Sequence, residues 1–315
     1  MKHVFVFDPK SFYNQQWKMD GIFDNIGQFF RTQVLPDFST QISRYRRDAL
    51  GIIQKEVDSA KEGDTVRIYA IGGEEILYDC LNGVAMFPNT ELAVVPHGET
   101  NDFLCIFGEG KTELFRDIPN LVQSKSIPTD IMSWGINYAL NSCYIGLNSA
   151  TAVKLKEIKS RLNKGFFIIF SKLSSFLNYI LTAFDKEITA QKYTISIDDK
   201  DFSGSYSLIH IANGPYYAGK LTGAANAIPD DGLLDVALIK SAGPLKTMWA
   251  MRRYSRGKKT SNSIVTQAKK ISIQSDREMW IQLDNEYIKE TSINLNVIPK
   301  AVHMVVLDGL SYQKL

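Results

Sequence analysis

Two turns in this sequence could bind a phosphate group. The first is Gly72-Gly73-Glu74-Glu75, which follows the apolar stretch Val66–Ile71 and precedes apolar residues at helical spacing. A strand, two glycines and a helix form such a site because glycine lets the backbone approach the ligand and the helix N-terminus directs free N–H groups at it. An ordinary tight turn between a strand and a helix would explain the same residues.

A second segment favours the phosphate site over the ordinary turn. Leu92–Pro96 reads as another apolar strand, and residues 98–102 read as a glycine turn that leads into a helix opened by polar residues. The sequence therefore contains the strand, glycine turn and helix pattern twice.

A hairpin near the C-terminus carries two further carboxylates. Residues 280–283 and 287–288 read as strands around the turn Asp284-Asn285-Glu286. Phosphoryl transfer needs a base beside the attacking hydroxyl and carboxylates that hold Mg²⁺. Taken alone, however, an Asp-Asn-Glu turn is common and carries no functional signal. Asn285 suits such a turn because Asn tolerates φ > 0.

The elements that position the two glycine turns alternate in type. Val4–Phe7 and Thr40–Arg44 read as strands, and apolar residues at helical spacing predict helices over 19–30 and 49–57. This alternation predicts a parallel sheet flanked by helices. Ligands of such sheets bind beyond the carboxyl ends of the strands, where both glycine turns lie.

From about Asp130 onward the pattern changes to closely spaced strands. The segments that read as strands are 192–197, 206–212, 271–274, 280–283, 293–298 and 302–307. They predict a largely antiparallel sandwich. The expected fold class is therefore an α/β nucleotide-binding domain followed by a β-rich sandwich domain.

The composition suits a folded protein of two domains. The chain has 315 residues, 44% of them hydrophobic, and its net charge of +2 gives no argument for nucleic acid. Its three cysteines lack metal-like spacing and suit a reducing cytosol. No secretory signal is visible, and no apolar run reaches the ~18 to 20 residues that span a bilayer. We expect a protein that is soluble or peripheral to a membrane.

Two basic stretches could contact an anionic membrane. The alternative for both is a solvated face beside core helices. The first stretch contains Lys154, Lys156, Lys159, Arg161 and Lys164 and runs into an apolar segment ending at Phe184. The second contains Arg252, Arg253, Arg256, Lys258 and Lys259.

Three motifs together resemble the diacylglycerol kinase-like bacterial lipid kinases, and the resemblance covers nearly the whole chain. Gly72-Gly73 followed by Asn82-Gly83 resembles the family's Gly-Gly-Asp-Gly-Thr loop and the Asn-Gly after it. Residues 96–103 resemble Pro-x-Gly-Thr-x-Asn-Asp-Phe, and residues 230–236 match Asp-Asp-Gly-Leu-Leu-Asp-Val. NAD kinases share the glycine loop, but the last two motifs point to a lipid kinase.

The resemblance implies an ATP-dependent kinase that uses Mg²⁺ and phosphorylates the hydroxyl of a diacylglycerol-like lipid. It implies Asp284 as the base, with Glu286 beside it in the catalytic turn, and Glu74, Asp102 and Asp130 as the ligands of the reacting Mg²⁺. The nucleotide-binding residues that it implies are Asp8, Ser11, Gly72, Gly73, Glu74, Gly98, Thr100 and Asn101.

The resemblance also implies a structural Mg²⁺ and the domain boundaries. Asp231 and the carbonyls of Ile228 and Leu233 would hold that ion, and a β-turn without an ion is the alternative. We expect the nucleotide-binding domain over residues 1–130 and the lipid and catalytic sandwich over 131–300. Residues 301–315 would form a C-terminal strand that returns to the first domain.

Departures from the family gather at the expected phosphate site. Asp8, Glu75 and Glu99 stand where the family has Asn, Gly and Thr, and Glu74 replaces an Asp of the magnesium network. Each added carboxylate would repel a phosphate charge by roughly 3 kcal/mol at ~5 Å and an effective dielectric constant of ~20. Two functions therefore stay open, an active lipid kinase and a catalytically impaired relative that binds lipid or regulates.

The expected partner is a lipid substrate at a membrane surface, and nucleic acid is not expected. The expected location is the cytoplasm, including the inner face of the membrane. The identity of the lipid and the oligomeric state, a homodimer included, stay open.

Overall fold

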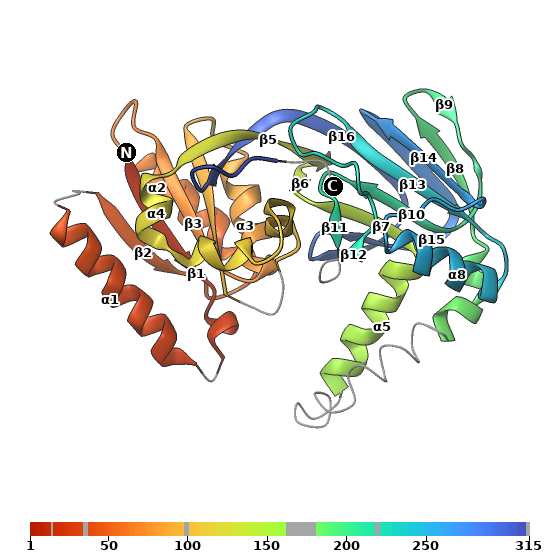
Figure 1. The fold of residues 1–315 in the computed structure, drawn as a ribbon, viewed down its shortest axis with the longest axis horizontal. Helices are drawn as coiled ribbons and strands as arrows, with labels where there is room; N and C mark the ends of the chain where they lie inside the picture. The colour runs from red at the N-terminus through yellow and green to blue at the C-terminus, as the bar shows by residue number, and fades with distance from the viewer. Residues whose placement is uncertain (14, 34–36, 98–100, 162–180, 218–220, 313–315) are drawn as a thin grey trace.

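The structure is a computed structural model that describes residues 1–315 except 14, 34–36, 98–100, 162–180, 218–220 and 313–315. The molecule is elongated, with an α/β half and a strand-rich half along its longest axis (Figure 1). The predicted fold class is confirmed. Among the residues that the structure describes, no helix is both long and apolar enough to cross a bilayer.

The first half is built on a parallel sheet in which β4, β3, β1 and β2 are neighbours in that order. Every residue of β1 and β3 is buried, as expected for strands covered on both faces. The strands are β1 Lys2–Phe7, β2 Phe38–Ile42, β3 Val66–Gly72 and β4 Thr90–Pro96, and the helices are α1 Gln16–Thr32, α2 Asp48–Asp58, α3 Glu74–Val84 and α4 Ile118–Gln123, with short 3₁₀ helices η1 Pro9–Phe12, η2 Phe103–Phe107 and η3 Lys111–Arg116.

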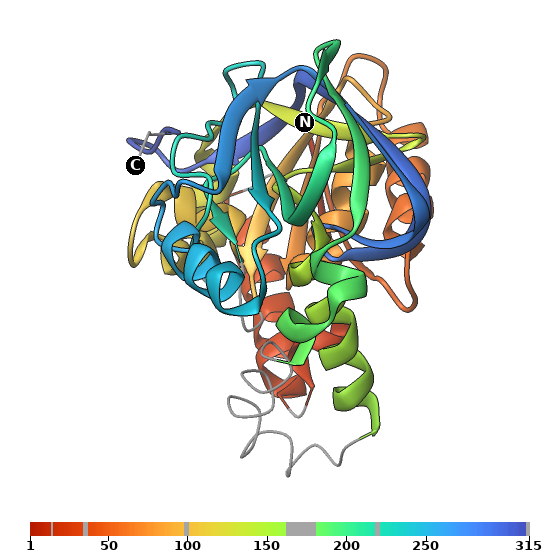
Figure 2. The ribbon, with the colours of Figure 1, turned by 90° about the vertical axis from the view of Figure 1, so that its right-hand side faces the viewer.

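The second half is mainly antiparallel, and α5 and α8 lie on one side of its sheet (Figures 1 and 2). Its helices are α5 Leu147–Arg161, α7 Lys186–Thr189 and α8 Pro244–Tyr254. Its strands are β5 Lys125–Trp134, β6 Asn137–Ala139, β7 Ser142–Gly146, β8 Lys192–Ile197, β9 Lys200–Asp201, β10 Gly204–Ala212, β11 Tyr216–Tyr217, β12 Leu221–Thr222, β13 Leu234–Lys240, β14 Ser263–Ala268, β15 Lys270–Leu283 and β16 Glu286–Val306.

Two pairs of segments that the sequence analysis separates are single long strands. β15 joins 271–274 to 280–283, and β16 joins 293–298 to 302–307. In each case the pairing register shifts at the junction, between Gln274 and Met279 and between Ile298 and Val302. A bulge places extra residues in a strand without ending it, which interrupts the apolar alternation that the prediction uses.

β16 connects the two halves. Its first part pairs with β15, whereas Met304 near its end pairs in parallel with Leu92 of β4. Val302, Met304, Val305 and Val306 belong to the hydrophobic core of the first half. The last residues of the chain therefore complete the core of the α/β half.

Candidate active site

A pocket of about 930 Å³ lies between the two halves. Its polar lining includes three carboxylates, Glu74 at the start of α3, Asp102 after β4 and Asp284 in the turn between β15 and β16. Much of its apolar lining comes from α5 and α8, through Ala152, Leu155, Met248 and Met251. The pocket thus combines acidic groups with a surface suited to an apolar ligand.

Glu74 follows the glycine turn directly and faces the other acids. Its Oε1 accepts a 3.2 Å hydrogen bond from the backbone N–H of Asp102. Burial, with the charges of Asp102 and Asp284, raises the pKa of Glu74 from 4.5 to about 7. The pocket therefore holds negative charge that a bound cation would neutralise.

Asp284 is held by three backbone donors. Its Oδ2 accepts from the N–H of Leu140 at 2.6 Å, and its Oδ1 accepts from Asn141 and Ser142 at 3.0 and 2.8 Å. Burial raises the pKa of Asp284 to about 6, although the three hydrogen bonds favour the charged form. Each carboxylate oxygen has two lone pairs, so Oδ2 keeps one for a proton. This carboxylate can act as a base near neutral pH.

The backbone of this turn differs in one respect from the expectation. Positive φ, expected at Asn285, occurs at Asp284, where φ is 47°. In two-residue hairpins of this kind the first central residue takes the left-handed conformation, and Asp tolerates it. The left-handed backbone conformation of this turn therefore belongs to Asp284, the residue that we expect to act as the base.

Glu286 is held by an arginine of the other half. Arg46, in the loop between β2 and α2, forms an ion pair with Glu286 Oε1. The next residue, Arg47, has φ 64° and donates from its guanidinium to Asn137 Oδ1 at 2.6 Å, while its backbone N–H donates to Asp79. One loop of the α/β half thus contacts the first residues of two strands of the second half, β6 and β16.

The contacts of Arg46 and Arg47 with the second half were not predicted from the sequence. In the sequence the two arginines only precede a helix, and their partners lie far away in the chain. No local signal marks such a contact.

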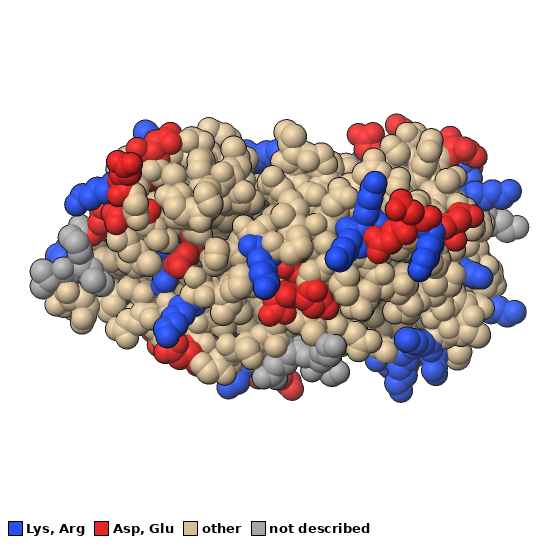
Figure 3. Space-filling view, turned by 90° about the horizontal axis from the view of Figure 1, so that it is seen from above, with Lys and Arg blue, Asp and Glu red and all other residues tan. Residues whose placement is uncertain are grey.

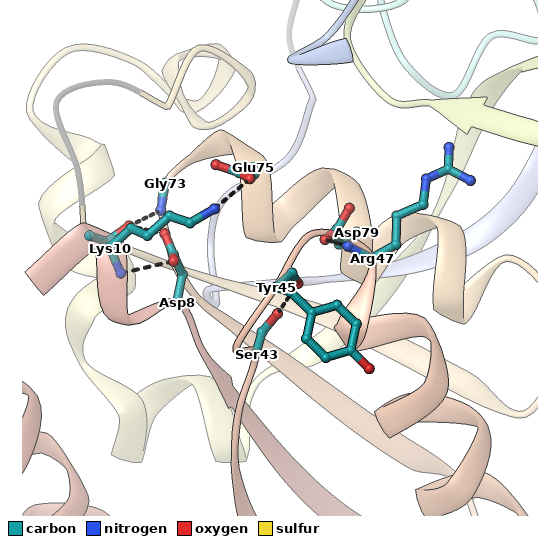
Figure 4. Close-up of polar contacts among 9 residues, drawn as sticks. Asp8, Lys10, Ser43, Tyr45, Arg47, Gly73, Glu75 and Asp79 are labelled. Atoms are coloured by element: carbon teal, nitrogen blue, oxygen red, sulfur yellow. Dashed lines mark hydrogen bonds and ion pairs between the residues drawn. The ribbon is translucent and has the colours of Figure 1, made fainter. Parts of the chain in front are cut away.

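Asp8 lies beside Gly73 of the glycine turn (Figure 4), and Ser11 contacts both residues. The N–H of Gly73 donates to Ser11 Oγ at 3.0 Å, and Ser11 donates to Asp8 Oδ2 at 2.6 Å. Asp8 also accepts from the N–H of Lys10 and so caps η1. Gly72 has φ 153°, and a Cβ at this position would lie 2.9 Å from that of Asp8, so the close approach requires glycine.

Glu75 points to Lys10 rather than standing alone (Figure 4). Their side chains form a 2.9 Å ion pair, and both are exposed at the surface. Gly73, the N-cap of α3, has no side chain that could accept from the N–H groups of the first helical turn. These N–H groups therefore suit an anion. Lys10 therefore offsets part of the negative charge that Glu75 brings to this turn.

Asn101 is buried at the edge of the pocket. Its Oδ1 accepts from the N–H of Leu104 at 3.1 Å, whereas its Nδ2 has no hydrogen-bond partner among the residues that the structure describes. A buried donor without a partner at a pocket wall fits a polar ligand. Gly98, Glu99 and Thr100, which the resemblance places at the nucleotide, lie outside the described residues.

Asp130 does not line the pocket with the other acids. It is fully buried, and its carboxylate accepts from the N–H groups of Gly232 and Lys300 at 2.6 and 2.7 Å. These bonds tie β5 to the 228–233 turn and to β16. Asp130 therefore lies apart from the two carboxylates that we propose as magnesium ligands, Glu74 and Asp102.

The 228–233 turn is closed by its own hydrogen bonds. The carbonyl of Ile228 accepts from the N–H of Asp230 at 2.9 Å, and Asp231 Oδ1 accepts from the N–H of Leu233 at 3.0 Å. A structural Mg²⁺ held by Ile228, Asp231 and Leu233 stays a prediction.

The pocket acids fit a shared magnesium ion. Over the described part of the chain, no three His, Cys, Asp or Glu side chains come close enough to hold a metal on their own. Mg²⁺, however, commonly binds one or two carboxylates together with substrate phosphates and water. Glu74 and Asp102 suit such a site because they are oxygen ligands beside the helix N-terminus that would bind the phosphates sharing the ion.

Comparisons with known proteins agree on both halves of the chain. Residues 4–134 match the diacylglycerol kinase catalytic domain, and residues 163–306 match the YegS C-terminal NAD kinase beta sandwich-like domain. The chain is 27% identical to "Putative lipid kinase SAR0780" of Staphylococcus aureus (strain MRSA252), over 95% of this chain and 97% of that protein. It is 26% identical to "Putative lipid kinase SH2167" of Staphylococcus haemolyticus (strain JCSC1435), over 93% and 94%.

Solved structures share the fold. A crystal structure described as a "putative diacylglycerol kinase" from Bacillus anthracis superposes with a TM-score of 0.74 at 20% identity, over 98% of this chain and 96% of that chain. A second structure with the same description and organism gives 0.73 at 19% identity. The arrangement of both halves is thus shared over the full length.

Proposed function

Because this chain belongs to the diacylglycerol kinase-like family, we propose that it transfers the terminal phosphoryl group of ATP to the hydroxyl of a diacylglycerol-like lipid. The observation that carries the proposal is the position of Asp284. Its carboxylate is held by three N–H donors in a pocket whose α5 and α8 walls are apolar. A lipid placed along those walls would bring its hydroxyl to a base of suitable pKa.

Each group has a role that follows from its position. Asp284 Oδ2 takes the proton as the hydroxyl oxygen bonds to the terminal phosphorus and the bond to the ADP oxygen breaks. The glycine turn and the N-terminus of α3 bind phosphate oxygens, and Asn101 Nδ2 donates to the nucleotide. Glu74 and Asp102 would hold Mg²⁺, which neutralises the charge on the phosphates when bound.

The alternative, an impaired relative that binds lipid without transfer, rests on Asp8, Glu75 and Glu99. The contacts of two of these weaken that argument. Asp8 caps η1 and accepts from Ser11, and Glu75 pairs with Lys10. A carboxylate engaged in this way repels a phosphate less than a free one does.

We further propose that the protein works at a membrane surface and faces the cytoplasm. Its three cysteines, Cys80, Cys105 and Cys143, all lie among the described residues and form no disulfide, as is usual in a reducing compartment. The substrate class supplies the reason for the membrane, because diacylglycerols partition into bilayers.

The test is transfer of labelled phosphate. The protein is incubated with Mg²⁺, ATP labelled in the terminal phosphate and mixed micelles of diacylglycerol, and the lipid phase is analysed for label. We expect labelled lipid from the unmodified chain and, from Asp284→Asn, a loss of about a hundredfold or more. The unfolding free energy of the variant shows whether it is folded. No labelled lipid from the unmodified chain, with ATP bound and a working control kinase, would refute the proposal and favour the alternative.

A further inference from the structure

Helix α8 has an outer face that the pocket does not use. Leu245 and Trp249 stand one helical turn apart on this face, with 75% and 56% of their surface exposed. The opposite face of the helix packs inward through Thr247, Ala250 and Met251. Large exposed apolar side chains in line on a helix mark an interaction surface.

The segment that carries this outer face is rich in Lys and Arg and contains no Asp or Glu. The residues from 241 to 262 include no Asp or Glu. Arg253 lies over the Trp249 ring, with its guanidinium carbon 5.1 Å from the ring centroid. The cations of the segment are Lys246, Arg252, Arg253, Arg256, Lys258 and Lys259.

The charge is local to this segment. The net charge of the chain is only +2, and on most of the face shown in Figure 3 the Lys and Arg side chains are interspersed with Asp and Glu. An acid-free run of six cations is therefore a feature of α8 and its following loop, not of the surface as a whole.

The same helix forms a wall of the pocket. Met248 and Met251 of α8 line it, and so does Arg252, which is exposed at the surface. Leu221, also exposed, lines it nearby. The pocket thus reaches solvent beside the charged and aromatic face of α8.

We propose that the outer face of α8, with the basic segment that follows it, docks onto an anionic lipid surface. Helices that lie in the membrane interface typically combine tryptophan and leucine with surrounding lysine and arginine. The aromatic ring lies at the level of the headgroups, and the cations contact anionic lipids. The choice of a membrane rests on the proposed lipid kinase function, because docking here puts the pocket opening next to the bilayer.

A protein with an acidic surface is the competing occupant, and the observations favour the membrane over it. The docking face adjoins a pocket with apolar walls, which a lipid entering from the bilayer would use and a protein partner would not.

The test is binding to vesicles in the absence of nucleotide, so that it stands apart from the kinase assay. The full chain is sedimented with phosphatidylcholine vesicles with and without phosphatidylglycerol. We expect binding only to the anionic vesicles. Each Lys or Arg near such a surface is worth about fivefold in partitioning, so Lys258→Glu with Lys259→Glu should weaken binding by at least about twentyfold.

The matched control is Lys125→Glu with Lys200→Glu, which changes the net charge equally at exposed positions on β5 and β9. We expect the control to retain most of the binding. In a second readout, the tryptophan fluorescence of the unmodified chain should shift to shorter wavelength on anionic vesicles, and Trp249→Phe should lose the shift. Equal weakening by both double variants, or no binding to either kind of vesicle, would overturn the proposal, and the latter would favour a protein partner for this face.

Discussion

Replacing Glu74 by Gln tests whether an ionised carboxylate, buried beside Asp102 and Asp284, destabilises the folded protein. Gln keeps the length of the side chain and the oxygen that accepts from Asp102, but it cannot ionise. Folding raises the pKa of Glu74 from 4.5 to about 7, so the ionised form destabilises the fold. At about 1.4 kcal/mol per pKa unit the cost is about 3 kcal/mol, an upper value because water in the pocket screens part of it.

The direction of the pKa shift of Glu74 fixes the pH range in which the stability cost appears. Because the folded pKa is the higher one, the cost is absent below pH 4.5, grows between pH 4.5 and 7 and is complete above pH 7. We expect Glu74→Gln to unfold with a free energy about 2 to 3 kcal/mol larger than that of the unmodified chain at pH 8, and less than about 1 kcal/mol larger at pH 5.

The assay is urea unfolding at both pH values with divalent cations removed by a chelator. Addition of Mg²⁺ at pH 8 should then stabilise the unmodified chain more than the variant, because it compensates the buried negative charge of Glu74 and its neighbours. Glu75→Gln is the matched control, since Glu75 is exposed and paired with Lys10. A Glu74→Gln protein that is less stable at pH 8, or shifted equally at pH 5 and 8, would refute this reasoning.

Three further predictions concern turnover and nucleotide affinity. Because burial raises the pKa of Asp284 to about 6 and the base must be ionised, turnover should rise with pH through about 6; a rate independent of pH between 4.5 and 7 in a pH series would contradict its role. Glu75→Gln should tighten nucleotide binding by up to about fivefold in calorimetry, because it releases Lys10 from a surface ion pair worth at most ~1 kcal/mol. Lys10→Ala should instead weaken nucleotide binding. Arg46→Ala should lower kcat by about twofold to fivefold with an unchanged KM for nucleotide, because Glu286, in the catalytic turn, loses its ion pair with the first half. Arg46→Lys should recover part of the loss, and a change in KM alone would argue for direct nucleotide contact.

The sequence predicted the elements whose signal is local. β3 and α3 follow from an apolar run, two glycines and a change of hydrophobic period, and the α1 and α2 helices contain the predicted ranges. Three of the carboxylates chosen by resemblance, Glu74, Asp102 and Asp284, line one pocket. Their roles as metal ligands and base stay predictions.

What the sequence could not supply depends on contacts between distant segments. Asp130 matches a family position, but its neighbours in space are the N–H groups of Gly232 and Lys300. The partner of Arg46 is Glu286, 240 residues along the chain. Either central residue of the hairpin turn, Asp284 or Asn285, could adopt a positive φ, because Asp and Asn both tolerate it. The sequence therefore did not indicate that Asp284 would be the one. None of these has a local pattern.

The path of β16 bears on how this chain can fold during its synthesis. Val302, Met304 and Val306 are synthesised after nearly all of the second half, and yet they pack in the core built on β1, β3 and β4. Until they arrive, the edge of β4 lacks its neighbour and part of that core stays open to water. An unpaired strand edge invites association with other chains. The α/β half, although it precedes the second half in the sequence, can therefore reach its final stability only after the strands of the second half have been made.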